Sequence, residues 1–117
     1  GTSVSYGRHF ISARKTNVLT VSVGYADGLS RRFSNDFSLL VEGEKVPIIG
    51  NICMDMCMLD GTDMKTKAHV ESLVEVFGKD RPADELADYL GTINYEITCV
   101  VGKRVQRIFA DENGIVQ

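Results

Sequence analysis

The sequence has few of the features that mark a membrane, secreted or nucleic-acid-binding protein. Its longest apolar runs are a handful of residues, whereas a membrane-spanning helix needs about 20. The N-terminal stretch GTSVSYGRHF lacks the apolar core of a signal peptide. Basic residues form short pairs such as Arg31-Arg32 rather than a stripe, and the pI is about 5.3. We therefore expect a cytoplasmic protein that binds neither membrane nor nucleic acid.

Cysteine is scarce as well. The three cysteines, Cys53, Cys57 and Cys99, are odd in number and show no paired spacing. We expect no disulfide framework, but reduced thiols within the core. A metal site needs three or four converging ligands, and the cysteines with the distant His9 and His69 supply no such pattern. No metal is expected.

What is present is the composition of one ordinary globular domain. The 117 residues are 44% hydrophobic and 25% charged, with a net charge of -3. A chain of this length can bury a single core. Neither a repeat nor a linker divides it, so residues 1–117 are interpreted as one domain.

Alternating runs separated by turns predict several short strands. Residues 17–25, NVLTVSVGY, alternate with the period of a half-buried strand. Residues 37–41 and 44–49 predict a hairpin around a Glu-Gly turn. Residues 72–77 predict another short strand, and RVQRIFA, 104–110, predicts a closing strand with its arginines facing outward.

Two short helices are predicted late in the chain. In RPADELADYLG, residues 81–91, apolar residues recur every three or four positions, Pro82 stands near the start and Gly91 follows the end. TINYEITCVVG, residues 92–102, has a similar spacing, so a helix is favoured over a strand despite its β-branched content. The fold class is therefore mainly β, a β-barrel or sandwich with two short helices.

The run NICMDMCMLD, residues 51–60, combines soft sulfur side chains with two aspartates. If the run is extended, Met54, Met56 and Met58 share one face and fill gaps in the core. Asp55 stands out, because a carboxylate in so apolar a run must be hydrogen-bonded or line a wet cleft. We expect a packed strand whose edge borders a functional site.

Three tyrosines stand near turns or element ends. The stretch GYADG, residues 24–28, follows a predicted strand and places Tyr25 and Asp27 in a tight turn, where functional side chains are common. Tyr6 lies in SYG and Tyr95 in NYE. A tyrosine accepts a proton efficiently at neutral pH only when its pKa of about 10 is lowered by a cation or hydrogen bonds. Exposed turn tyrosines remain the simpler interpretation of these residues alone.

Taken in order, VSYG, VGYADG, VPIIGNICMD, DELADYLGTINYEI and RVQRIF resemble the C-terminal domain of bacterial alanine racemases. The resemblance runs from Val4 to Phe109, and the combination is far more specific than any single motif. It implies a β-barrel, Greek-key-like domain of a two-domain enzyme that uses pyridoxal 5'-phosphate. The N-terminal (β/α)₈ barrel, whose lysine binds the cofactor in that family, is absent from this chain.

The resemblance also implies roles for individual residues. Tyr6 matches the tyrosine that is the acid/base on the face used by L-alanine, opposite the barrel lysine. Met54 matches the residue whose backbone N–H holds the substrate carboxylate, and Tyr95 matches the tyrosine that reaches the cofactor phosphate. Residues that match the substrate access corridor or flank Met54 in the same cleft are Tyr25, Arg31, Ile93, Cys53 and Asp55.

In the family's head-to-tail homodimer, this domain completes the active site in the partner subunit's barrel. The isolated chain is therefore expected to be inactive, and an exposed sheet edge is expected to make it self-associate. Tyr95 favours alanine as the substrate, and D-alanine would serve peptidoglycan synthesis. Met56 and Gln106 depart from the family pattern, away from the chemistry.

Other interpretations stay open. The chain could be a non-catalytic dimerisation module whose tyrosines serve packing, which the presence of a barrel with its lysine elsewhere in the polypeptide would decide. It could also belong to a broad-specificity amino-acid racemase, or to a decarboxylase of similar architecture, which a substrate profile would distinguish.

Overall fold

The computed structural model describes residues 3–4, 10–11, 16–111 and 114–116. The elements in chain order are β1 (Ser3–Val4), β2 (Phe10–Ile11), β3 (Val18–Val21), the 3-10 turns η2 (Tyr25–Asp27) and η3 (Arg31–Phe33), β4 (Ser38–Val41), β5 (Glu44–Ile49), β6 (Cys57–Asp60), β7 (Val74–Glu75), α1 (Ala83–Leu90), α2 (Asn94–Cys99), β8 (Phe109–Asp111) and β9 (Gly114–Val116). None of the helices in this described part is long and apolar enough to cross a membrane.

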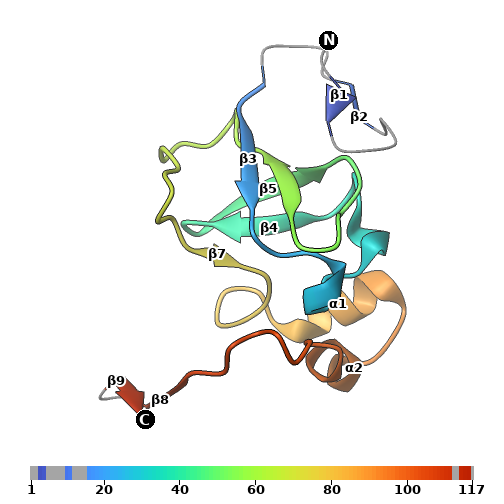
Figure 1. Ribbon diagram of the computed structural model, residues 1–117, viewed down its shortest axis with the longest axis vertical. Helices are drawn as coiled ribbons and strands as arrows, with labels where there is room; N and C mark the ends of the chain where they lie inside the picture. Colours follow the sequence, from blue (N-terminus) through green and yellow to red (C-terminus); the bar gives the residue numbers. More distant parts are fainter. Residues whose placement is uncertain (1–2, 5–9, 12–15, 112–113, 117) are drawn as a thin grey trace.

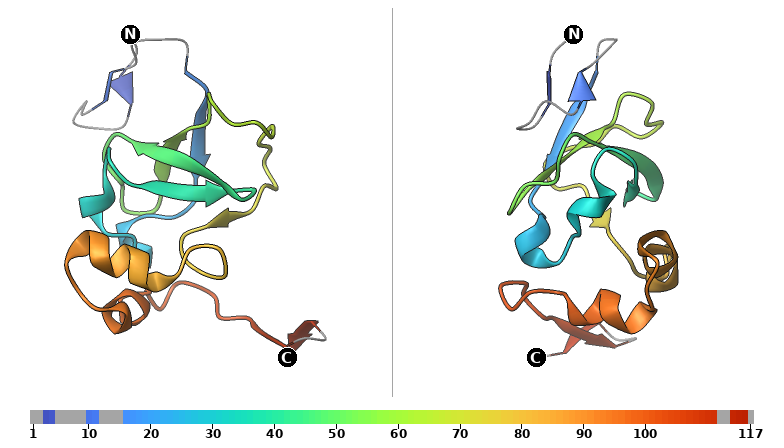
Figure 2. Two further views of the ribbon diagram at one scale, coloured as in Figure 1. Left: turned by 180° about the vertical axis from the view of Figure 1, so that it is seen from behind. Right: turned by 90° about the vertical axis from the view of Figure 1, so that its right-hand side faces the viewer.

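A five-stranded antiparallel sheet in the order β3-β6-β5-β4-β7 forms the body of the domain. The sheet is strongly curled, and α1 and α2 lie together at one end of it (Figure 1, Figure 2). The hairpin of β8 and β9 stands away from the sheet at the end of an extended segment (Figure 1). The prediction of a mainly β domain with two short helices is confirmed.

The predicted hairpin forms between β4 and β5. Glu42 and Gly43 in its turn both have positive φ, 49° and 81°, the pattern of the turn whose twist matches the flanking strands. A glutamate rarely adopts this conformation. Here Leu73 holds it, because its N–H donates to Oε1 of Glu42 and its carbonyl accepts from the Glu42 N–H, both at 3.1 Å. Strands also form within 17–25 and 72–77, as the shorter β3 and β7.

Both predicted helices form, and they share the core with the sheet. Gly91 ends α1 with a φ of 73°, and residues 94–99 are helical rather than extended. Buried apolar side chains from the sheet, the 51–56 loop and the helices include Leu39, Val46, Ile48, Ile52, Leu59, Leu86 and Ile97.

A buried cation ties the sheet to the first helix. Arg81 is 1% exposed, and its guanidinium donates to the carbonyl and hydroxyl oxygens of Ser38 in β4. Its Nε lies 3.3 Å from a carboxylate oxygen of Glu85 in α1. Because a guanidinium offers several donors in one plane, a single side chain connects the two elements.

Residues 51–60 differ from the expected continuous strand. Only Cys57–Asp60 form β6, and its inward residues are a cysteine and a leucine. Met54 and Met56 are 52% and 38% exposed, so the prediction that these methionines fill the core is wrong. A tight turn, closed by the Cys53 N–H and the Met56 carbonyl at 2.9 Å, interrupts the alternation.

The closing strand expected at 104–110 is also wrong in its extent and its pairing. Only Phe109–Asp111 are extended, as β8, and they pair with β9 rather than with the five-stranded sheet. The guanidinium of Arg107 turns back and donates to the carbonyls of Val101, Gly102 and Val105, at 2.6 to 3.1 Å. These contacts hold the segment in an irregular conformation.

The three free cysteines lie in different environments. Cys57 is buried, Cys53 is half-buried and Cys99 is exposed, so the expected place in the core is wrong for Cys99. Burial raises the pKa of the Cys57 thiol to about 12, and the neighbouring Cys53 adds to this shift.

Alkylation should follow these environments. At pH 8 we expect iodoacetamide to modify Cys99 first and Cys57 last, because the thiolate is the reacting form and Cys57 is both protonated and inaccessible. Peptide mass spectrometry over a time course measures the three rates, which should converge in denaturing urea. Equal rates for Cys57 and Cys99 in the native protein would contradict this description of the core.

Two leucines of opposite exposure test the position of the core. Leu39 is fully buried and Leu73 is 80% exposed. Leu39→Ala should lower the free energy of unfolding by about 2–5 kcal/mol, because it removes buried methyl groups and leaves a cavity. Leu73→Ala should change it by less than about 0.5 kcal/mol. Urea titration checks both values, and similar losses for the two variants would mean that the core is misplaced.

Candidate functional site

Two segments far apart in the sequence meet at the candidate site. The turn η2 follows Gly24, and the loop 51–56 precedes β6. The N–H of Tyr25 donates to the Cys53 carbonyl at 3.0 Å, and the N–H of Ala26 donates to the Met54 carbonyl at 2.8 Å. The turn and the loop are therefore joined backbone to backbone.

Gly24 makes this close approach possible. A Cβ at this residue would lie 2.2 Å from the carbonyl oxygen of Cys53 and 2.5 Å from that of Met54. The φ of Gly24 is -148°, in the extended region, so the glycine is needed for the space it leaves rather than for an unusual backbone conformation.

The direction of these carbonyls decides where the next amides point. In a planar trans peptide the N–H is directed opposite to the C=O. Because the carbonyls of Cys53 and Met54 point at η2, the N–H groups of Met54 and Asp55 point away from it. Neither of these two N–H groups has an acceptor among the residues that the structure describes. Adjacent amides directed to the same side can hold a carboxylate or another anion.

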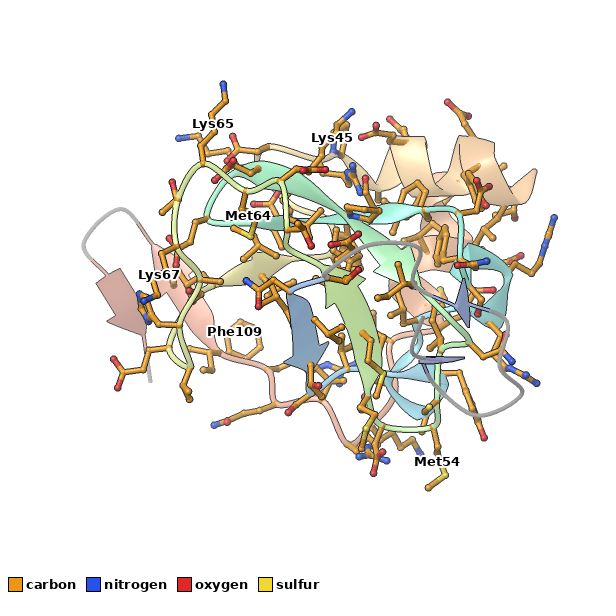
Figure 3. All side chains as sticks on the ribbon, turned by 90° about the horizontal axis from the view of Figure 1, so that it is seen from above. Lys45, Met54, Met64, Lys65, Lys67 and Phe109 are labelled. Atoms are coloured by element: carbon orange, nitrogen blue, oxygen red, sulfur yellow. The ribbon has the colours of Figure 1, made fainter. Side chains whose placement is uncertain are left out.

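The side chains of the loop border open space. Met54 projects outward at the edge of the molecule (Figure 3), while Asp55 is exposed and Cys53 is half-buried. Asp55 lines an open cavity of about 590 Å³, together with Asp27 and Arg104. The loop thus carries two amides without an acceptor among the described residues, and the second of them belongs to a residue that lines a cavity with charged side chains.

Tyr25 and Arg31 are neighbours beside the loop. Tyr25 is 45% exposed at the start of η2, and Arg31 begins η3. The guanidinium carbon of Arg31 lies 5.9 Å from the centre of the Tyr25 ring, near the outer limit of a cation–π contact. The cationic side chain of Arg31 and the phenol of Tyr25 are therefore neighbours beside the 51–56 loop.

Asp27 and Arg104 stabilise the turn η2. The sequence analysis named Asp27 only as a side chain in this turn, without a partner, and did not single out Arg104. Oδ2 of Asp27 accepts from the Gly24 N–H at 2.9 Å, and Oδ1 lies 2.9 Å from Nε of Arg104. The Asp27 carbonyl accepts from the Gly102 N–H at 3.0 Å. The three-residue spacing of Gly24 and Asp27 is that of a capping box, and this signal could have identified the contact with Gly24.

Tyr95 and Ile93 lie around the start of α2, 73% and 64% exposed. Asn94 donates from Nδ2 to Oδ1 of Asp84 at 2.7 Å, which fastens this end of α2 to α1. The Tyr95 hydroxyl has no hydrogen-bond partner among the described residues. A hydroxyl donor with no competing partner is suited to an anionic oxygen such as that of a phosphate group.

The expected site residues fall into two groups. Residues at or beside the junction of η2 and the loop are Tyr25, Arg31, Cys53, Met54 and Asp55. Tyr95 lies in α2 and Ile93 immediately precedes it. Residues of α2 and η2 line a common cavity of about 470 Å³, whose lining is largely apolar. No hydrogen bond or ion pair between described residues joins Tyr95 to the 51–56 loop. Tyr6 lies outside the described residues, and within those residues no group of side chains is arranged to hold a metal.

Comparison with known proteins gives one consistent family. The sequence model of the family described as "Alanine racemase, C-terminal domain" matches residues 1–109. Alanine racemase of Desulfovibrio desulfuricans is 41% identical over 111 residues, which are 95% of this chain and 30% of that protein. Alanine racemase 1 of Clostridium acetobutylicum is 40% identical over an alignment of 121 positions, which covers 100% of this chain and 31% of that protein.

Solved structures of alanine racemases also resemble this chain. An alanine racemase of Clostridium difficile 630 matches with a TM-score of 0.92 and 36% identity, over 100% of this chain and 30% of that one. Alanine racemase of Bartonella henselae, solved with covalently bound pyridoxal phosphate, matches with a TM-score of 0.88 and 37% identity, over 92% and 30%. The chain thus spans about 30% of the length of these relatives.

A methyl group at Gly24 should separate the turn from the loop. In Gly24→Ala we expect hydrogen exchange of the Tyr25 and Ala26 amides to accelerate by about tenfold or more, since their acceptors must move away. Gly78→Ala is the matched control, because there the added atom meets only the Glu75 side chain, at 3.3 Å. Unchanged exchange in Gly24→Ala, measured by NMR, would show that the junction tolerates a side chain.

Proposed function

The chain belongs to the alanine racemase family as its C-terminal domain, and we propose on that basis that it is part of an enzyme that interconverts L- and D-alanine. The observation that carries the proposal is the agreement of the family match over residues 1–109 with structural similarity at a TM-score of 0.92. The chain would supply this domain's groups to a site completed by a (β/α)₈ barrel outside residues 1–117.

Racemisation sets the first requirement on these groups. A proton must leave one face of the substrate Cα and return on the other, so two bases must stand on opposite sides of it. We assign Tyr6 to the face used by L-alanine, opposite a lysine of the barrel. Pyridoxal phosphate, when bound, supplies the conjugated ring that stabilises negative charge on Cα.

The substrate carboxylate must also be held while the proton moves. We assign this task to the backbone N–H of Met54, and its direction away from η2 supports the assignment. A backbone donor explains how a methionine occupies a binding position, because its side chain takes no part. Cys53 and Asp55 would flank the carboxylate, and their exposed or half-buried positions agree with this place.

The cofactor phosphate would take a hydrogen bond from the Tyr95 hydroxyl. Tyr25, Arg31 and Ile93 would line the corridor through which alanine reaches the site. All four side chains are exposed in this chain, which supports a site that is completed by another part of the polypeptide or by the partner subunit of a homodimer.

The wider context follows from the same assignment. We propose alanine as the substrate, a cytoplasmic enzyme, and D-alanine destined for peptidoglycan. The isolated chain, which has only one of the two bases, should neither racemise alanine nor bind pyridoxal phosphate tightly.

Loss of the α-proton in deuterated water tests the assignment directly. In the full-length polypeptide, Tyr6→Phe should slow exchange of L-alanine by about 100-fold or more, because its base is removed. Exchange of D-alanine should persist, since the lysine on the other face remains. Proton NMR of each enantiomer measures both rates.

Tyr89→Phe is the matched control, since Tyr89 is not among the residues assigned to the site. Its hydroxyl donates to Asp36, and its ring packs on Phe33 and Phe37. It should exchange both enantiomers as the parent does. If Tyr6→Phe also behaves as the parent, the tyrosine is no base and the domain is better described as a structural partner.

A further inference from the structure

We infer that Asp27 is a positioning residue for the substrate carboxylate, acting through the peptide between Cys53 and Met54. The inference rests on the proposed function and adds residues to it. Among the described residues, Asp27 forms no hydrogen bond with Met54 or Asp55. Its effect is transmitted by five backbone groups, the N–H groups of Gly24, Tyr25 and Ala26 and the carbonyls of Cys53 and Met54.

The first step runs from the carboxylate to the turn. The Asp27 side chain is 12% exposed, and each of its oxygens has its own partner. Oδ2 accepts from the Gly24 N–H at 2.9 Å, which closes the loop of chain from Gly24 to Asp27 on itself. With this bond in place, the backbone of η2 has little freedom to rotate the amides of Tyr25 and Ala26.

The second step runs from the turn to the loop. The amides of Tyr25 and Ala26 hold the carbonyls of Cys53 and Met54 at 3.0 and 2.8 Å. Each carbonyl shares a rigid plane with the amide that follows it. A rotation of η2 would therefore turn the Met54 N–H away from the carboxylate it is proposed to hold.

The third step fixes the turn from its other side. Nε of Arg104 pairs with Oδ1 of Asp27 at 2.9 Å, and the Gly102 N–H donates to the Asp27 carbonyl at 3.0 Å. A Cβ at Gly102 would lie 2.7 Å from the Ala26 carbonyl oxygen, so the 102–104 segment lies directly against η2. The turn is held between this segment and the 51–56 loop.

The ion pair has an electrostatic consequence as well. Asp27 and Asp55 line the same open cavity, and Asp55 also carries one of the two amides that have no acceptor among the described residues. Two unpaired carboxylates there would repel an anionic substrate group. The guanidinium of Arg104 lines that cavity too and offsets one of the two charges.

The test replaces the carboxylate by its neutral isostere in the full-length enzyme. Asp27→Asn keeps one acceptor but loses the pair with Arg104. We expect the KM for alanine to rise about 5- to 20-fold in both directions, with kcat within about twofold, because the carboxylate is held alike in ground and transition states. Propionate, a carboxylate without an amino group, should inhibit competitively with a Ki raised by a similar factor.

Asp88→Asn is the matched control, an exposed aspartate on α1 with the same change of charge. It should leave KM, kcat and the propionate Ki as in the parent. Arg104→Gln provides a second variant in case Asp27→Asn fails to fold, since the Arg104 side chain is 50% exposed and removable. It should raise KM and Ki in the same direction by about threefold.

The outcomes separate the inference from the proposed function. A parent enzyme that does not racemise alanine overturns the proposed function and the inference with it. If the parent is active but the variants keep its KM and propionate Ki, the inference alone is wrong. A loss of kcat and melting temperature at unchanged KM would also overturn it, because Asp27 would then be needed only for folding.

Discussion

The pair of hydrogen bonds from the amides of Tyr25 and Ala26 to the 51–56 loop is the constraint on which this edge of the domain depends. These bonds join a segment that precedes the β4–β5 hairpin in the sequence to one that follows it. They form only because Gly24 leaves room for the carbonyls of the loop. Through the planarity of the peptide, they also direct the N–H groups of Met54 and Asp55 away from η2. One backbone contact thereby links the packing of the fold to a surface able to hold an anion.

The sheet and helices supply the rigid support for this edge. Ile52, near the start of the loop, is fully buried, and β6 begins just after the loop, so both ends of the loop are anchored in the core. Arg81 fastens the sheet to α1, and Asn94 fastens α2 to α1. Functional groups on short loops are well placed when such anchors lie next to them. Tyr25 and Tyr95, which this support carries, are both exposed. Their exposure is consistent with our proposal that another part of the enzyme completes the site.

Sequence patterns predicted the elements whose stability is local. The β4–β5 hairpin, β3 and both helices follow from alternation, turn residues and helix-end signals within a few positions. The prediction that the methionines of residues 51–60 share one buried face was wrong. Periodicity assumes one continuous conformation, whereas a turn from Cys53 to Met56 interrupts the strand. The prediction of a closing strand at 104–110 was wrong because contacts of the Arg107 side chain stabilise an irregular conformation there. A pattern of alternation cannot predict such contacts.

For the candidate site too, some features could be predicted from the sequence and others could not. The family, the candidate residues and the glycine-rich turn could be predicted from the order of residue types along the chain. Three other features were found only in the folded domain: Gly24 leaves space for the loop, the Met54 amide points away from η2, and Asp27 pairs with Arg104. Directions of peptide planes and contacts between distant segments arise when the chain packs in three dimensions, so no linear motif contains them.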